Sequence, residues 1–340
     1  MIGALAYWQE TGLRVAGVLA AVLIPAGTFV YVYLFKMVSH LQSRLGPMEA
    51  GPHGSLQLFA EVAKSLQKED IIPERADRTL FKLAPYLVVG SVLLVYVAVP
   101  FGPDAWFADL DVGVFYALAV SSVSVIGVLV AGWASANKYS LMGGLRAGGQ
   151  LIAYELPLVL GVVGVVIQAE SLNLRQIVFQ QAEGEIFGFG ALGNPYVLTQ
   201  FVGLLLFLMA AQAELAQAPF DMPIAESELV TGYITEYSGM RFLLFFIGEF
   251  AAAGVLAALA ATLFLGGWWL PGLDVDADYM NFVGPLVLFG KMMAIAFVIF
   301  WVRFTFPRFR EDQLQTLAWK FLIPISLVNI LVTGVLKVVF

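Results

Sequence analysis

Cysteine is absent from this chain of 340 residues. Its absence excludes disulfides, iron–sulfur clusters held by thiolates, and thiol nucleophiles. Histidine is nearly absent as well, since only His40 and His53 occur and no carboxylates accompany them at the spacing of a metal site. The sequence therefore predicts that this chain holds no metal or redox cofactor of its own. Any such cofactor is expected in a partner.

Charged residues are also scarce. They make up only 13% of the chain, while 60% is hydrophobic; soluble domains average about 25% charged and about 45–50% apolar residues. This composition predicts an all-α integral membrane protein. The apolar runs predict a single membrane domain, residues 1–340, built as a bundle of about eight transmembrane helices near 15–38, 83–100, 112–134, 149–169, 196–218, 241–265, 282–304 and 321–340.

Basic residues are unevenly distributed among the expected loops. The loops after the first, third, fifth and seventh spans, with their flanks, contain nearly all of them, whereas the loops after the second, fourth and sixth spans contain only Arg175. Because loops rich in Lys and Arg stay in the cytoplasm, both termini are expected on the non-cytoplasmic side. The expected location is the inner (cytoplasmic) membrane of a cell, crossed several times.

The first cytoplasmic loop, residues 39–82, contains a periodic segment. Apolar residues recur at helical spacing from Leu56 to Leu66, opposite Glu61, Lys64 and Lys68. This pattern is typical of an amphipathic helix on the membrane surface, although an ordinary helix packed on the bundle has the same periodicity. Beside the first span, such a helix would frame an opening through which a lipid-soluble molecule enters from the bilayer.

A glycine-rich run, GGLRAGG, covers residues 143–149. It lacks the Lys-Ser/Thr ending and the preceding strand of a phosphate-binding loop. We therefore interpret it as a tight cytoplasmic turn before the fourth span.

Acidic residues are concentrated between the fifth and sixth spans. The segment AELAQAPFDMPIAESELVTGYITEYSGMR, residues 213–241, contains Glu214, Asp221, Glu226, Glu228 and Glu236, with Arg241 as the only base. A carboxylate at the membrane centre costs roughly 2.5–3.5 kcal/mol, so acids at such depth are usually retained for moving ions or protons. The cluster predicts a proton route, although Asp221 alone has an alternative role as a helix N-cap and Glu226 as a first-turn charge.

Three more ionisable residues, Glu155, Glu249 and Lys291, lie inside expected spans. Side chains of this kind at membrane depth form proton relays or interhelical ion pairs. Two interpretations therefore stand here. In the first, protons pass along a string of these groups. In the second, Lys291 pairs with one of the glutamates and holds two helices together.

Four longer runs resemble one protein family. They are GPHGSLQLFAEVAKSLQKEDIIP (51–73), GWASANKYSLMGGLRAGGQLIAYELPL (132–158), APFDMPIAESELVTGYITEYSGM (218–240) and RFTFPRFREDQLQTLAWKFLIP (303–324). These runs and the expected helix layout are similar to the H-subunit family of NADH-quinone oxidoreductase, whose members lie in the membrane arm at the elbow of respiratory complex I. The resemblance implies that the cytoplasmic loops dock a peripheral arm carrying flavin and iron–sulfur clusters, and that together they enclose a chamber where quinone, the substrate, is reduced. Buried acids would then link this chamber to proton-pumping subunits.

The resemblance also implies roles for individual residues. Catalytic roles in proton movement fall to Glu155, Glu214, Asp221, Glu226, Glu228, Glu236 and Glu249, and quinone-binding roles to Glu61, Lys64, Phe220, Arg303 and Arg308. In two places this chain has less charge near the implied quinone path. It reads Leu34-Phe35-Lys36 where the family usually has Glu-Arg-Lys or Glu-Arg-Arg, and Gln217 where the family often has arginine. The implied partners are other membrane-arm and peripheral-arm subunits and the lipid bilayer, with no nucleic acid.

Two other interpretations remain beside this one. A homologous membrane subunit of an energy-converting hydrogenase or a ferredoxin-linked complex would share the helix bundle without reducing quinone. A free-standing transporter or channel fits less well, because the sequence shows no inverted repeat and its charged cytoplasmic surface needs a partner. The run APFD…AESELV…EYS favours the quinone enzyme.

Overall fold

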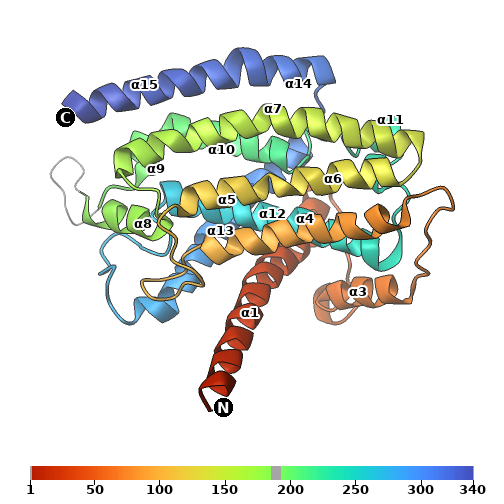
Figure 1. Ribbon diagram of the computed structural model, residues 1–340, viewed down its shortest axis with the longest axis horizontal. Helices are drawn as coiled ribbons and strands as arrows, with labels where there is room; N and C mark the ends of the chain where they lie inside the picture. Colours follow the sequence, from red (N-terminus) through yellow and green to blue (C-terminus); the bar gives the residue numbers. More distant parts are fainter. Residues whose placement is uncertain (1, 185–192, 340) are drawn as a thin grey trace.

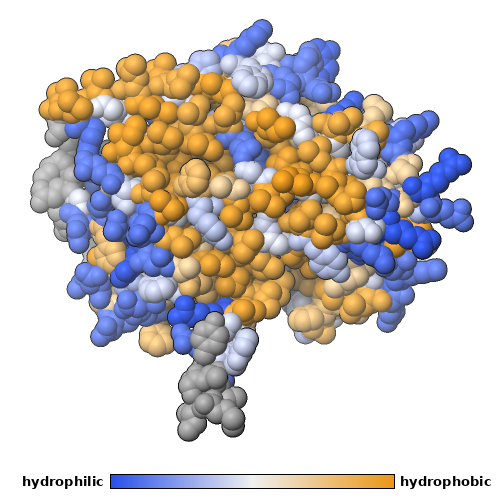
Figure 2. Space-filling view, in the orientation of Figure 1, coloured by the Kyte–Doolittle hydropathy of each residue, from blue (hydrophilic) through white to orange (hydrophobic). Residues whose placement is uncertain are grey.

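The computed structural model describes residues 2–184 and 193–339, and all regular structure within these ranges is helical. Most of the long helices lie side by side in a bundle (Figure 1). A broad apolar band crosses the molecule between two polar ends (Figure 2). Within the described ranges, seven helices are long and apolar enough to cross a membrane. The predicted all-α membrane fold is therefore confirmed.

The seven spanning helices begin and end at different residues from those expected. They are α1 (Ile2–Phe29) continued by η1 (Val30–Met37) and α2 (Val38–Leu41); α4 (Arg78–Ala98); α5 (Gly113–Ser121) with α6 (Val123–Ala134); α7 (Lys138–Ala169); α12 (Gly239–Phe264); α13 (Met280–Thr305); and α14 (Glu311–Leu317) continued by η5 (Ala318–Leu322) and α15 (Ile323–Val339). Shorter helices connect them: η2 (Pro52–Gly54), α3 (Gln57–Gln67), α8 (Leu174–Glu183), α9 (Tyr196–Thr199), α10 (Phe201–Glu214), α11 (Glu226–Leu229) and η4 (Gly232–Ile234). In Figure 1, α3, α11 and α14 lie at one end of the bundle and α8 at the other.

The span expected at 196–218 is divided and shorter. α9 ends at Thr199, and the apolar helix α10 has only 14 residues, fewer than the roughly 20 that a crossing needs. α10 ends at Glu214, and Ala216 then takes a positive φ of 48°, a backbone conformation that does not continue a right-handed helix. The chain therefore leaves the helix at Glu214, before the end expected at residue 218.

The expected turn at residues 143–149 is wrong, because the whole GGLRAGG run lies inside α7. That helix begins earlier, where the side chain of Asn137 accepts a hydrogen bond from the backbone N–H of Tyr139 at 2.8 Å. The glycines permit close packing instead of a turn. A Cβ at Gly143 would lie 2.7 Å from the Cα of Gly232, and a Cβ at Gly132 would lie 2.9 Å from the Cα of Gly144.

The predicted surface helix is α3, and both interpretations of it describe part of what is seen. One side of α3 packs on α12, where carbonyls of Ser65 and Lys68 lie close to Gly239. On another side, the apolar residues Phe59 and Leu66 are 72% and 64% exposed. An exposed apolar stripe on a helix beside the bundle is the feature expected of a helix in the membrane interface.

Among the described residues, Lys291 pairs with backbone carbonyls and not with a glutamate. Its ammonium group, from α13, donates hydrogen bonds to the carbonyls of Leu265, Gly267 and Trp269, the one to Gly267 at 2.9 Å. These carbonyls follow the end of α12, where backbone acceptors have no partner within the helix. A cation there also interacts favourably with the negative end of the helix dipole. Lys291 thus caps the C-terminal end of α12 and connects it to α13.

Lys291→Met should lower the thermal stability of the purified protein in detergent. The change leaves three backbone acceptors without their donor, and an unsatisfied buried polar group costs about 1–3 kcal/mol. The matched control is Lys337→Met, since Lys337 is an exposed lysine near the end of α15 that forms a salt bridge with Glu170, and it should change the melting temperature little. Equal melting temperatures for the two variants would contradict the role given to Lys291.

Candidate functional site

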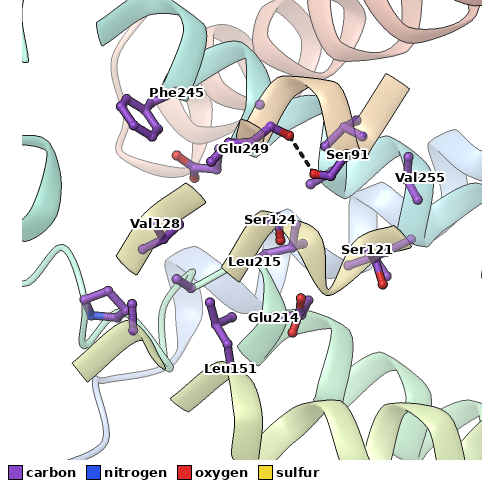
Figure 3. A pocket seen from close by; sticks show the side chains of 18 of the residues that line it. Ser91, Ser121, Ser124, Val128, Leu151, Glu214, Leu215, Phe245, Glu249 and Val255 are labelled. Carbon is purple, nitrogen blue, oxygen red and sulfur yellow. Dashed lines mark hydrogen bonds between the residues drawn. The ribbon is translucent and has the colours of Figure 1, made fainter. Parts of the chain in front are cut away.

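A cavity of about 90 Å3 lies inside the bundle, between α4, α5, α6, α7, α10 and α12. Two carboxylates, Glu214 and Glu249, line it. The hydroxyls of Ser91, Ser121 and Ser124 line it as well, and Ser124 lies between the two glutamates in Figure 3. A buried water needs roughly 10–15 Å3 of such space and two to four polar partners. The cavity therefore has both the volume and the polar groups to hold several waters.

Glu249, on α12, is held by two donors from different parts of the chain. Arg303, in the last turn of α13, donates to its Oε1 atom at 2.8 Å. Gln217, which is only 1% exposed, donates to the same oxygen at 3.0 Å. The second carboxylate oxygen has no partner among the described residues and is left for the cavity. The neutral Gln217, one of the two departures from the family pattern, is therefore a direct neighbour of a candidate acid.

Glu214 and Glu155 form the inner part of the site. The last residue of α10 is Glu214, and its Oε2 atom is buried without a hydrogen-bond partner in the described ranges. Glu155, on α7, accepts a hydrogen bond from Ser122, the residue at the break between α5 and α6. The two carboxylates lie close enough for their charges to interact. Two acids whose charges interact, one of them with a buried oxygen that has no described partner, form a place where a proton can be shared.

Two arginines bind acids of the loop after α10 at the surface of the bundle. Arg308 contacts Asp221 at 3.2 Å and Glu228 at 3.8 Å. Arg146, from α7, contacts Glu228 at 2.7 Å. We call Arg146, Asp221, Glu228 and Arg308 the outer cluster. Arg241, the only base within the acidic segment, is not part of it and instead pairs at 2.7 Å with an acid outside that segment, Asp70.

The two acids of the outer cluster differ in their electrostatics. Burial raises the pKa of Asp221, while the guanidinium groups of Arg308 and Arg303 oppose that shift. The hydrogen bond from Arg146 lowers the pKa of Glu228, which is exposed. Asp221 is therefore the member of the cluster more readily protonated, and Glu228 stays ionised.

Arg308→Met should move the titration of Asp221 to higher pH. Burial already raises the pKa of this carboxyl, and without Arg308 the largest opposing charge is lost, so the protonated form persists to higher pH. The infrared C=O band of the protonated carboxyl, identified by its loss in Asp221→Asn, measures this. Arg310→Met is the control, because Arg310 is exposed and contacts only Asp312 among the described acids. A band that titrates at the same or a lower pH in Arg308→Met would contradict this assignment.

The remaining predicted residues do not join the cavity or the outer cluster. Glu226 is exposed in the first turn of α11, which agrees with its alternative role as a first-turn charge. No helix begins directly after Asp221, so Asp221 does not have its alternative role as a helix N-cap. Glu236 accepts a hydrogen bond from Asn137 and lines a separate open hollow. Glu61 and Lys64 pair with each other on α3.

Phe220 lies in a buried aromatic cluster. Its ring is 5.2 Å from that of Tyr154 and 5.5 Å from that of Phe309, measured between centroids, and the residue is 3% exposed. Its quinone-binding role stays a prediction. Along the chain, Phe220 lies on the segment that connects Glu214, at the cavity, with Asp221, in the outer cluster.

The sequence did not reveal several groups that complete the site. Arg146 lies in the run interpreted as a turn, and helical periodicity through that run would have placed it on the same face as Gly143. Ser91, Ser121, Ser122 and Ser124 had no local signal, because isolated serines are common in membrane helices. Their common property is spatial: they border the acids.

Comparison with known proteins places the chain among named relatives. The sequence model of a family described as NADH dehydrogenase matches residues 13–334. The relatives are H subunits of NADH-quinone oxidoreductase. The chain is 46% identical to the one numbered 2 in Syntrophobacter fumaroxidans, with 93% of this chain and 92% of the relative covered. It is 44% identical to that of Brevibacillus brevis, covering 94% and 91%, and 43% identical to that of Phocaeicola vulgatus, covering 89% and 84%.

Proposed function

Since this chain belongs to the H-subunit family of NADH-quinone oxidoreductase, we propose that it is a membrane subunit of a complex I that couples quinone reduction to proton translocation. The chain itself binds no redox cofactor. Flavin and iron–sulfur clusters of partner subunits deliver two electrons, and quinone takes up two protons with them to become quinol. The chain sits in the inner (cytoplasmic) membrane with both termini on the non-cytoplasmic side.

One arrangement supports the proposal most directly: ionisable groups follow one another from the surface of the bundle to its interior. Asp221 and Arg308 lie in the outer cluster. The next group inward is the pair of Arg303 with Glu249, and Glu249 shares the cavity with Glu214. Such a row is costly in a membrane bundle unless ions or protons use it.

The charges in this row influence one another. Arg303 and Glu249 both affect the pKa of Asp221, the arginine lowering it and the glutamate raising it. Proton uptake by quinone beside Arg303 and Arg308 therefore changes the field at Glu249. Glu249 then exchanges a proton with Glu214 through waters of the cavity, and Glu155 passes the change toward the partner subunits.

The quinone tail enters along the first helix. Leu34 and Phe35 are half-buried and pack against the apolar core, and Lys36 donates to the carbonyl of Pro47 at 2.8 Å. Leu58, on α3, lies 3.7 Å from the Cβ position of Gly27. An apolar lining of this kind suits an isoprenoid chain, while Glu61, Lys64, Arg303 and Arg308 provide the polar groups along the path.

Purification of the intact complex through a tag on this chain tests the proposal. Flavin-bearing and iron–sulfur subunits should co-purify, and the preparation should reduce quinone at the expense of NADH. Hydrogen evolution without quinone reduction would assign the chain to an energy-converting hydrogenase instead. Recovery of the chain alone, with transport activity, would favour the transporter. The names of the relatives favour the first outcome.

A further inference from the structure

Gln150 holds two points of the acidic segment at once. It lies on α7 and is 2% exposed. Its side-chain amide donates to the carbonyl of Ala213 at 2.8 Å and to the carbonyl of Phe220 at 2.7 Å. Both protons of the amide nitrogen are therefore used. Its Oε1 atom is buried without a partner in the described ranges, so the two donated bonds are what fix this side chain.

The two carbonyls directly precede two acids. Ala213 is followed by Glu214, which lines the cavity, and Phe220 by Asp221, which belongs to the outer cluster. Between them the chain leaves α10 and takes a positive φ at Ala216. No regular helix holds this connection. Backbone hydrogen bonds close its turns, from the N–H of Ala216 to the carbonyl of Ala213 at 3.1 Å and from the N–H of Phe220 to the carbonyl of Gln217 at 2.8 Å, and side chains tie it to the neighbouring helices. Gln150 is the side chain that ties its first and last residues to one nitrogen atom.

A second glutamine supports the connection at a different point. Gln212 donates to the carbonyl of Ala218 at 2.8 Å, which adjoins neither acid. Loss of Gln212 would remove a hydrogen bond from the middle of the connection, whereas loss of Gln150 would leave both ends with backbone hydrogen bonds alone and detach them from α7. The two losses differ because Gln212 holds a carbonyl that adjoins neither acid, whereas Gln150 holds the carbonyls that directly precede both.

We propose that Gln150 is a positioning residue that sets the distance between Glu214 and Asp221 and thereby the proton exchange between the cavity and the outer cluster. This inference rests on the proposed function. Gln150 takes up no proton itself, because an amide does not titrate in this range. It acts through the backbone from which the two acids project.

Gln150→Met tests the inference, because it retains the volume of the side chain and removes both donors. In the assembled complex, quinone reduction coupled to pumping should fall about 10- to 100-fold, the range expected when reacting groups are displaced by about 1 Å. The infrared bands of the protonated carboxyls that disappear in Glu214→Gln and Asp221→Asn should also shift. A purely structural role would lower the yield and leave these bands in place.

The matched control is Gln181→Met. Gln181 is 0% exposed, donates to the carbonyls of Thr262 at 3.0 Å and Ile177 at 3.3 Å, and accepts from the N–H of Tyr196 at 3.2 Å. Gln181→Met therefore removes the same two buried donations, and one acceptor as well, from a residue outside the cavity and the outer cluster. Turnover and carboxyl bands should stay as in the wild type. Gln150→Asn, which keeps the amide one methylene shorter and cannot reach both carbonyls, serves if Gln150→Met does not assemble.

The outcomes separate this inference from the proposed function. Wild-type turnover and unshifted bands in an assembled Gln150 variant, with Glu214→Gln inactive, would overturn the positioning role alone. Unchanged pumping in Glu214→Gln would overturn the proton route itself. Failure of both Gln150 variants to assemble, with Gln181→Met assembled, would make Gln150 a folding residue and would also overturn the positioning role.

Discussion

Glu214→Gln should lower quinone reduction coupled to proton pumping by about 10²- to 10⁴-fold, the range expected on losing a group that transfers protons. The amide retains the shape of the side chain, so the complex should still assemble. Glu214 is the residue to change because it lines the cavity and has a buried oxygen without a partner among the described residues. Steady-state turnover and proton uptake in vesicles measure the effect.

Glu183→Gln is the control for this experiment. Glu183 is an exposed glutamate at the end of α8 and is not among the residues that line the cavity, so its loss should leave turnover and pumping unchanged. Normal pumping by an assembled Glu214→Gln complex would remove this residue from the proton route. Loss of assembly in Glu214→Gln would instead indicate that the carboxyl serves the fold.

Arg303→Met should have the second largest effect. Among the described residues, the change leaves Glu249 with only the amide of Gln217 as a donor, and removing one partner of a buried charge pair typically costs about 3–5 kcal/mol. Because both side chains are about a quarter exposed, water offsets part of that cost and the lower end is expected. Without the arginine, Glu249 loses the charged partner that holds its carboxylate in place, so pumping should fall together with stability.

A double-mutant cycle separates these two effects. Glu249→Gln combined with Arg303→Met removes both charges, so stability should recover relative to Arg303→Met alone. Pumping should not recover, since no carboxyl remains at position 249. Melting temperature and pumping are measured on all four proteins of the cycle. Additive losses of stability would show that the two side chains do not interact as their 2.8 Å contact indicates.

The helices were predictable from the sequence to different degrees. Long apolar runs identify spans such as α12 and α13 because hydropathy alone decides whether a helix is stable in a bilayer. The same measure extended α10 to residue 218, past its end at Glu214. That end coincides with the positive φ of Ala216 and with a hydrogen bond to the carbonyl of Ala213 from Gln150, 63 positions away in the chain. Hydropathy contains no information on either.

The acids of the site were visible in the sequence, whereas their partners were not. Carboxylates stand out in an apolar chain because few other charges surround them. Their cations come from distant segments, since Arg146 and Glu228 are 82 positions apart in the chain and Arg308 and Asp221 are 87 positions apart. Arg241, the only base within the acidic segment, pairs with Asp70 outside it. Only the three-dimensional arrangement shows that two acids of the loop, Asp221 and Glu228, have arginine partners within the same chain.

The contact between Gly143 and Gly232 limits how this sequence can change over generations. A Cβ at Gly143 would press on the Cα of Gly232, and a Cβ at Gly232 would lie 1.7 Å from the carbonyl oxygen of Pro223. Gly232 also has a φ of 60°, which residues other than glycine rarely adopt. Neither position can therefore accept a larger residue as a first step. Variation at this contact has to begin with a rerouting of the segment that follows Pro223, and position 143 can vary only afterwards.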